Sequence, residues 1–232
     1  DFPSQYFFDV RPSLKRIRVE GLYMDESELF DLRRSLETIR DVVRFLRQTD
    51  DEEDEEAHSP YPALYELAGE VMVFPMLIAR INDILDKFGK VKDNASPELL
   101  RIRRELAATT GSISRSLNSI LRTAQAEGYV EKDVTPTMRD GRLVIPVAPG
   151  MKRKIRGIVH DESATGKTVF IEPAEVVEAN NRIRELEGEE RREIIRILTD
   201  FSSVVRPHVP ALLQSYEFLA EVDFIRAKAL WG

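Results

Sequence analysis

The chain has 232 residues, a hydrophobic fraction of 42% and no cysteine. The chain is long enough for one large domain or two small ones. The lack of cysteine excludes disulfide frameworks and thiolate metal sites. The net charge of −7 argues against a protein that coats nucleic acid uniformly. No apolar run approaches the ~18 residues of a membrane span, so we expect no membrane partner. The first residue is Asp1 rather than Met, and we expect the chain to be a piece of a longer protein.

Helical periodicity dominates the first part of the chain. Apolar residues recur with a 3.6 period over 26–48 and predict an amphipathic helix. Two further helical pieces are expected over 61–74 and 76–88, broken or kinked at Pro75. Between the helix predicted over 26–48 and these two pieces, residues 50–56 are an unbroken run of acids, which predicts a solvated, self-repelling loop. Calcium binding is the alternative, but the run lacks the glycine and the alternating spacing of a calcium loop.

A long helix is predicted over 96–128. Ser96 is a candidate N-cap, Pro97 suits the first helical turn, and Gly128 ends the pattern. At 1.5 Å per residue such a helix is about 45 Å long, too long to be buried along its whole length in a chain of this size.

A second long helix is expected from 173 to 205, closed by Pro207 and Pro210, and a last helix covers 211–230. The two long helices flank a block of strand-like sequence at 134–171. If the ends of that block lie close together, the helices run side by side in opposite directions, and their apolar stripes give them a seam.

The strand block contains two hairpin signals. Asp140-Gly141 separates two strand-like runs and supplies the positive φ angles of a type I′ turn. Pro146 cannot donate to a ladder, so we expect its strand to lie at an edge or to be bulged there. The second predicted hairpin joins 152–161 to 167–172.

The tripeptide Gly166-Lys167-Thr168 matches the last three residues of the phosphate-binding P-loop motif. A P-loop also needs a glycine five places earlier, where this chain has Asp161. The residues that follow are β-branched and aromatic, typical of a strand rather than of the helix that a P-loop requires. We therefore interpret the tripeptide as part of a polar turn between two strands.

Basic residues concentrate in this block. Between positions 132 and 167, eight basic residues stand against four acidic ones, a local balance of +4. The eight candidate nucleic-acid contacts are Lys132, Arg139, Arg142, Lys152, Arg153, Lys154, Arg156 and Lys167. A basic patch on an acidic chain indicates a polyanion site; the alternative is that these charges protect a sheet edge. Few aromatic residues are available for stacking, which favours duplex or structured nucleic acid over single strands.

No catalytic or metal-binding constellation is evident. His160 and Asp161 are adjacent strand residues on opposite faces, so they do not form a dyad. Ser163 and Thr165 have no evident base, and Glu172 is expected to be a helix-entry residue. The three histidines are far apart and lack zinc-ligand spacing. We expect no enzyme activity, cofactor or metal in this piece.

The sequence resembles the second bacterial MutS family, the MutS type II proteins. The motifs that carry the resemblance are DVRPSLKRI at 9–17, DNASPELLRIRREL at 93–106, RDGRLVIPV at 139–147, GIVHDESATGKTVFIEP at 157–173 and VVEANNRIRELEGEE at 176–190. Together they cover nearly the whole chain. Lys167 stands at a variable place of the family's motif, which agrees with a turn rather than a nucleotide site.

The resemblance implies a mainly α fold with a small antiparallel β insertion. In that fold, residues 1–95 are a helical core to which 207–232 returns. The lever helices are 96–128 and 173–206, a long antiparallel, coiled-coil-like stalk. The β-hairpin clamp between them is 129–172.

The resemblance also implies a function. The chain would be a non-catalytic, DNA-clamping region of a homodimeric bacterial cytoplasmic ATPase that acts on duplex or branched DNA to suppress homologous recombination. ATP and Mg²⁺ would bind in a domain that begins after Gly232, and a small MutS-related nuclease domain would follow. Mismatch reading is not implied, because the family lacks that N-terminal domain. Two alternatives stay open: binding to collided ribosomes through the same region, and a purely mechanical dimer scaffold.

Overall fold

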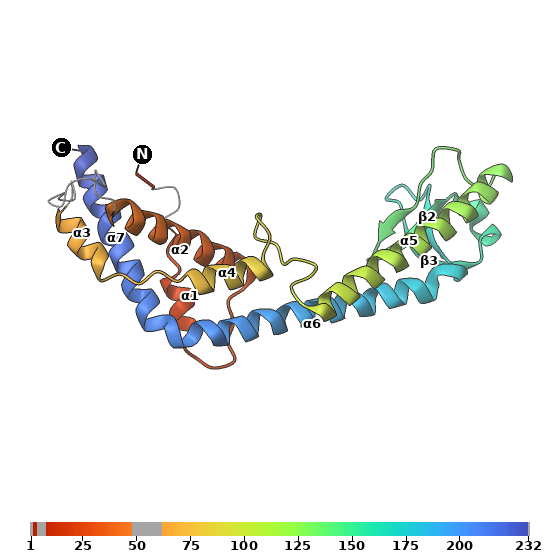
Figure 1. The fold of residues 1–232 in the computed structure, drawn as a ribbon. Helices are drawn as coiled ribbons and strands as arrows, with labels where there is room; N and C mark the ends of the chain where they lie inside the picture. Colours follow the sequence, from red (N-terminus) through yellow and green to blue (C-terminus); the bar gives the residue numbers. More distant parts are fainter. Residues whose placement is uncertain (1, 4–7, 48–61, 232) are drawn as a thin grey trace, which may run out of the picture. The chain divides into compact units, whose positions relative to one another are not determined.

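The structure, a computed structural model, describes residues 2–3, 8–47 and 62–231 (Figure 1). The expected fold class, mainly helical with a small antiparallel sheet, is confirmed. The chain forms two compact units: Asp1–Ser96 with Ile194–Gly232, here called the helical unit, and Pro97–Glu193, here called the sheet unit. Across the described helices, none combines the length and the apolar character that crossing a membrane requires. The acidic run 50–56 lies outside the described residues.

The helical unit packs short and medium helices around the apolar stripe of α2. Its helices are α1 (Arg11–Arg16), α2 (Glu26–Arg47), α3 (Pro62–Gly69), α4 (Pro75–Ile84) and α7 (Val209–Trp231), together with the last part of α6 (Val177–Val205). Buried α2 residues such as Leu32, Leu36 and Ile39 step by three and four, as the 3.6 period predicts. The buried hydroxyl of Ser202 accepts a hydrogen bond from the Met24 amide at 2.9 Å, which ties the end of α6 to the segment before α2.

Prolines begin helices in this unit rather than kinking them. Pro75 is the first residue of α4, where its missing N–H would have no intrahelical partner, so α3 and α4 are separate helices. The second long helix, α6, ends at Val205 as expected, but the two prolines after it do not interrupt the helical path. Pro207 lies in a single 3₁₀ turn, η3 (Arg206–His208), and Pro210 lies in the first turn of α7, so the chain stays helical through both.

In the sheet unit, α5 (Pro97–Ala126) runs antiparallel to the first part of α6 (Figure 1). The direction follows from the contacts: Arg103 pairs with Glu190 at 3.1 Å, whereas Leu117 and Leu121, further along α5, share a buried cluster with Val176, the residue directly before α6. The predicted pairing of the two long helices is therefore confirmed over this stretch.

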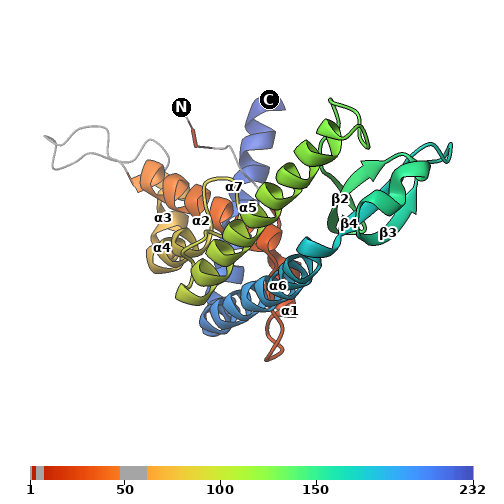
Figure 2. The same ribbon diagram turned by 90° about the vertical axis from the view of Figure 1, so that its right-hand side faces the viewer.

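The sheet has four antiparallel strands in the order β1-β2-β4-β3, and Figure 2 shows β2, β4 and β3 side by side. The strands are β1 (Thr137–Arg139), β2 (Arg142–Val147), β3 (Gly157–Glu162) and β4 (Val169–Pro173). Asp140 and Gly141 have φ angles of 51° and 74°, so the predicted type I′ turn between β1 and β2 is confirmed. Ile145, Val147, Val169 and Ile171 pack against α5 in one apolar cluster.

The sheet corrects two details of the expected strands. β2 is not an edge strand, since it pairs with β1 through residues 142–144 and with β4 through 145–147. Pro146 nevertheless lies beyond the end of the β1 ladder, where a missing N–H is harmless. The second hairpin is confirmed between β3 and β4, but the residues before it are not strand: Pro149–Lys154 form a 3₁₀ helix, η1.

Candidate nucleic-acid interface

Four of the predicted contacts lie together on one exposed segment. Lys152, Arg153 and Lys154 occupy the last turn of η1, and Arg156 follows one residue before β3. All four are exposed, and we call them the basic segment. Pro149 fixes the first turn of η1, and cations are favoured in the last turn, where carbonyl groups point outward. The strand expected over 152–156 is thus replaced by a helical turn that displays its cations to solvent.

The cations of the basic segment are not engaged in internal ion pairs. Among the described residues, none of the four has a carboxylate within salt-bridge distance, and the same holds for Lys132 and Lys167. The Lys154 ammonium lies 5.5 Å from the ring centroid of Tyr129, a weak cation–π contact. These side chains are therefore available to an anion that approaches from solvent.

A hollow of about 360 Å³ adjoins the basic segment. Its lining includes Lys154 and Arg156, the ring of Tyr129, and the hydroxyl residues Ser119 and Thr123 of α5. Glu127 and Glu175 also line it, so the hollow itself is of mixed charge. Its cationic lining residues, Lys154 and Arg156, are the part suited to phosphate oxygens.

The other predicted basic residues lie on separate loops and strands. Lys132 follows α5 on a loop held by Gln125, whose amide donates to the carbonyl groups of Glu131 and Lys132. Lys167 is exposed in the turn before β4. The Arg139 guanidinium carbon lies over the Phe170 ring, 4.1 Å from its centroid, and Nε lies 4.0 Å from an Asp161 oxygen, so the charge of Arg139 is partly offset.

Arg142 does not belong to an exposed interface. It is buried, its Nε donates to Glu172 Oε2, and its Nη2 donates to Asn181 Oδ1 at 2.7 Å. An arginine engaged in this way is not available to phosphate. Arg142 is therefore removed from the candidate contacts, which leaves seven basic residues and a local balance of +3.

Glu172 is the centre of a buried polar network that the sequence patterns did not predict. Its side chain has no exposed surface and contacts Arg142, His160 Nε2 at 3.0 Å and Asn180 Nδ2 at 2.8 Å. Burial by itself would raise the pKa of Glu172, but the hydrogen bonds from these partners, Arg142 first, hold the pKa below its ordinary value. The sequence signal that could have indicated the network is the position of Glu172 directly after the apolar residues of β4.

The network is structural in character. It joins β2, β3 and β4 to the first turns of α6, since Arg142 also donates to the Val177 carbonyl. A β-bulge between Val159 and Asp161 inserts His160 as an extra residue of β3 and brings it to Glu172. His160 therefore contacts Glu172 rather than forming a dyad with Asp161.

The Gly166-Lys167-Thr168 tripeptide is part of a hairpin turn. Gly166 has a φ of 66°, and its amide donates to the Ser163 carbonyl at 2.8 Å. The Ser163 amide and the Thr168 carbonyl close the turn at 2.8 Å, and β4 follows directly. A strand at the place where a P-loop needs a helix confirms the interpretation of this stretch as a turn.

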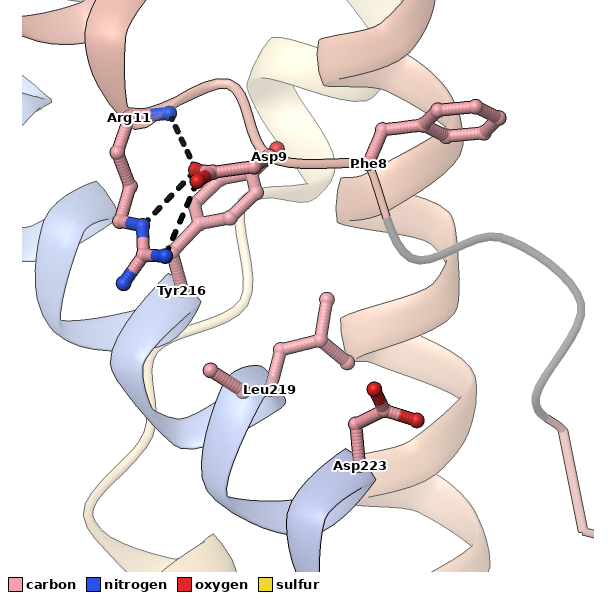
Figure 3. A pocket seen from close by; sticks show the side chains of 7 residues that line it. Phe8, Asp9, Arg11, Tyr216, Leu219 and Asp223 are labelled. Carbon is pink, nitrogen blue, oxygen red and sulfur yellow. Dashed lines mark hydrogen bonds and ion pairs between the residues drawn. The ribbon is translucent and has the colours of Figure 1, made fainter. Parts of the chain in front are cut away.

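A second, smaller hollow of about 130 Å³ lies in the helical unit (Figure 3). It lies between the residues leading into α1 and helix α7, and Tyr216 and Leu219 form part of its wall. The Arg11 guanidinium donates to both oxygens of Asp9, at 2.8 and 3.0 Å, and lowers the pKa of that carboxyl. The cation that lines this hollow is thus engaged inside the unit, and we interpret the hollow as packing of the N-terminal segment on α7.

No family model matches the chain. It is similar to curated proteins named endonuclease MutS2: 38% identical over 230 residues to that of Geobacillus sp. (strain WCH70), 37% over 224 residues to that of Pelotomaculum thermopropionicum, and 36% over 230 residues to that of Halalkalibacterium halodurans. The alignments cover 97–99% of this chain but only 27–28% of those proteins. The chain therefore corresponds to one segment of such a protein, which supports the resemblance indicated by the motifs.

Proposed function

We propose that this chain is the core, lever and clamp region of a MutS2-type protein, and that its basic segment contacts the phosphate backbone of duplex or branched DNA. The observation that carries the proposal is the display of Lys152, Arg153, Lys154 and Arg156 on one exposed turn, without internal ion pairs in the described structure. The chain as a whole carries −7, so this local excess of positive charge makes the sheet unit the part best suited to a polyanion.

Contacts of this kind would position the DNA without reading its sequence. Lysine and arginine side chains neutralise phosphates and release counterions, a term that carries most non-specific affinity. Binding of this kind suits a clamp that recognises DNA structure better than a protein that recognises a base sequence. It is therefore consistent with a role in suppressing homologous recombination.

The rest of the sheet unit supplies a rigid support. The antiparallel pairing of α5 with α6 and the buried Glu172 network hold the sheet against the helices in two independent ways. In the proposed protein this segment has no catalytic role. ATP and Mg²⁺ binding and nuclease chemistry would belong to the remainder of the longer chain, and the full-length protein would be a homodimer.

The test is the salt dependence of DNA binding by the full-length protein, with a Holliday junction and a linear duplex of equal length as probes. Reversing Lys152, Lys154 and Arg156 to Glu should weaken binding to both. It should also reduce the slope of log K against log[salt] by up to about 0.9 for each phosphate that is no longer neutralised.

A matched control reverses three exposed basic residues of the helical unit, Arg18, Arg44 and Arg80, and so changes the net charge by the same amount. An equal loss of affinity in both variants would mean that net charge alone acts, and would contradict a local contact. An unchanged slope in the basic-segment variant would also overturn the proposal.

Co-sedimentation with stalled ribosomes, using the same two variants, separates the competing functions. If the basic-segment variant loses only ribosome association, the relevant nucleic acid is ribosomal RNA. If it loses neither, the region is a mechanical scaffold.

A further inference from the structure

Strand β3 forms an open edge of the sheet with apolar side chains exposed on it. Within the described ranges of the chain, it pairs with β4 alone. Ile158 and Val159, its central residues, are 49% and 47% exposed. Edge strands with exposed apolar residues are templates for pairing with another strand.

The backbone groups that face outward can be assigned from the ladder. The Ala174 amide donates to the Arg156 carbonyl at 2.9 Å, so residues 156 and 158 face β4 and residues 157 and 159 face outward. The pairing of Gly157 with Pro173 agrees, since Pro173 has no N–H to donate. Gly157 and Val159 therefore offer two donors and two acceptors to an approaching strand.

Charge is distributed unequally about this short edge. Basic side chains precede it, at Lys154 and Arg156, and acidic side chains follow it, at Asp161 and Glu162. A second copy of β3 in antiparallel orientation would bring the basic end of each strand to the acidic end of the other. A parallel copy would place like charges together. The edge is thus self-complementary under a two-fold axis, the property required of an isologous interface.

We infer that β3 pairs antiparallel with β3 of a second copy, about a two-fold axis at Ile158. Gly157 of each strand then exchanges both hydrogen bonds with Val159 of the other, and the two Ile158 side chains meet as a non-hydrogen-bonded pair. The residues that precede β3 in one copy, including Lys154, then lie at the same end of the pair as the residues that end β3 in the other copy, including Glu162. The two sheets become one sheet of eight strands. The inference goes beyond the proposed function and does not depend on DNA binding.

The competing interpretation is that the edge is protected. The bulge at His160 and the acids after it are devices that limit edge pairing. They act on the second half of the strand, however, and leave the Gly157–Val159 half regular.

The absence of cysteine from the chain makes the test specific. Ile158→Cys places two thiols across the proposed axis, where the Cα separation of a non-hydrogen-bonded pair, about 4.5 Å, allows a disulfide. Glu162→Cys is the matched control, because it lies on the same exposed strand but far from its symmetry mate in an antiparallel pair. Both variants are oxidised at equal micromolar concentration and followed on non-reducing gels, with circular dichroism to verify folding.

The expected result is covalent dimer from the Ile158→Cys variant at an initial rate at least about tenfold that of the control, because pre-association raises the local thiol concentration. Equal rates would indicate random collision or parallel pairing, and either overturns the inference. No dimer from either variant overturns it as well.

A charge exchange provides the second test, in the Ile158→Cys background. Glu162→Lys should slow cross-linking several-fold at low salt, and adding Lys154→Glu should restore it, because the pair is reversed rather than removed. Failure of the double variant to recover, while both variants keep the circular dichroism of the parent, would contradict the antiparallel register.

Discussion

Arg142 Nε donates to Glu172 Oε2 across 2.5 Å, and the accepting carboxylate has no exposed side-chain surface. Removing one member of a buried ion pair leaves the other charged and without compensation, which costs about 3–5 kcal/mol. We therefore expect Arg142→Ala to lower the free energy of unfolding by that amount, measured by urea denaturation. Arg139→Ala is the control, since that arginine lies on the surface over Phe170, and its effect should be much smaller. Equal effects would show that the buried pair contributes nothing beyond surface packing.

The same network predicts a specific pH dependence. The folded pKa of Glu172 lies below its ordinary value, so the unfolded chain takes up this proton more readily than the folded chain. The carboxylate contributes its full stabilisation above its unfolded pKa, about 4.3, and loses it as the pH falls through the lower folded pKa.

Glu172→Gln should remove that contribution. The difference in unfolding free energy between the parent and this variant should therefore be constant at neutral pH and shrink below about pH 4.3. Urea unfolding of both proteins from neutral pH into this acidic range measures it. Other carboxyls whose folded pKa is lowered, such as Asp9 and Glu28, are common to both proteins and cancel. Parallel curves would exclude a role for Glu172 ionisation.

The pairing of α5 with α6 should depend on its apolar seam more than on its ion pairs. Leu117 is fully buried in the cluster beneath the sheet, and Leu117→Ala should cost about 2–5 kcal/mol through reduced burial and the cavity left behind. Arg182 donates to Glu105 at 2.8 Å on the surface of the same helix pair, and solvent screens that interaction. Chemical denaturation should rank Leu117→Ala well above Arg182→Ala, and the reverse order would mean that the charged contacts hold the helices together.

The turn between β1 and β2 should be sensitive to one glycine. Gly141 has a φ of 74°, where a Cβ strains the backbone, so Gly141→Ala should destabilise the sheet unit by about 1–2 kcal/mol. Gly150 serves as the control because it lacks a positive φ and a Cβ there meets no atom within 4 Å. Gly150→Ala should be neutral or slightly stabilising, since it reduces the entropy of the unfolded chain. A similar destabilisation from both substitutions, seen in thermal unfolding, would contradict the turn assignment.

Much of the fold was predictable because its signals are local. The apolar period of α2, the cap and glycine that bound α5, and the Asp140-Gly141 turn each lie within a few residues of the feature they determine. Prolines were harder to interpret. The break at Pro75 and the end of α6 at Val205 agree with the expectation. Pro207 and Pro210, however, lie in a 3₁₀ turn and in the first turn of α7, because a proline fits the first turn of a helix as well as the residues that follow one.

The candidate interface was less predictable, because exposure depends on contacts between distant residues. Arg142 was grouped with the surface cations since sequence gives no sign that Glu172, thirty positions later, lies beside it. Residues 152–156 were included in a predicted strand of the second hairpin, whereas Pro149 starts a 3₁₀ helix that runs to Lys154. Whether the exposed cations meet DNA stays a prediction.

The brevity of β1 has a consequence for how many copies could associate. Each sheet has two outer strands, and indefinite growth by strand addition needs both. β1 has only three residues, and Pro136 lies directly before it, so the side opposite β3 offers little length for a ladder. Pairing through β3 as proposed would use the longer edge strand of each copy and leave the two short ones, so the assembly would close as a pair instead of growing into a fibre.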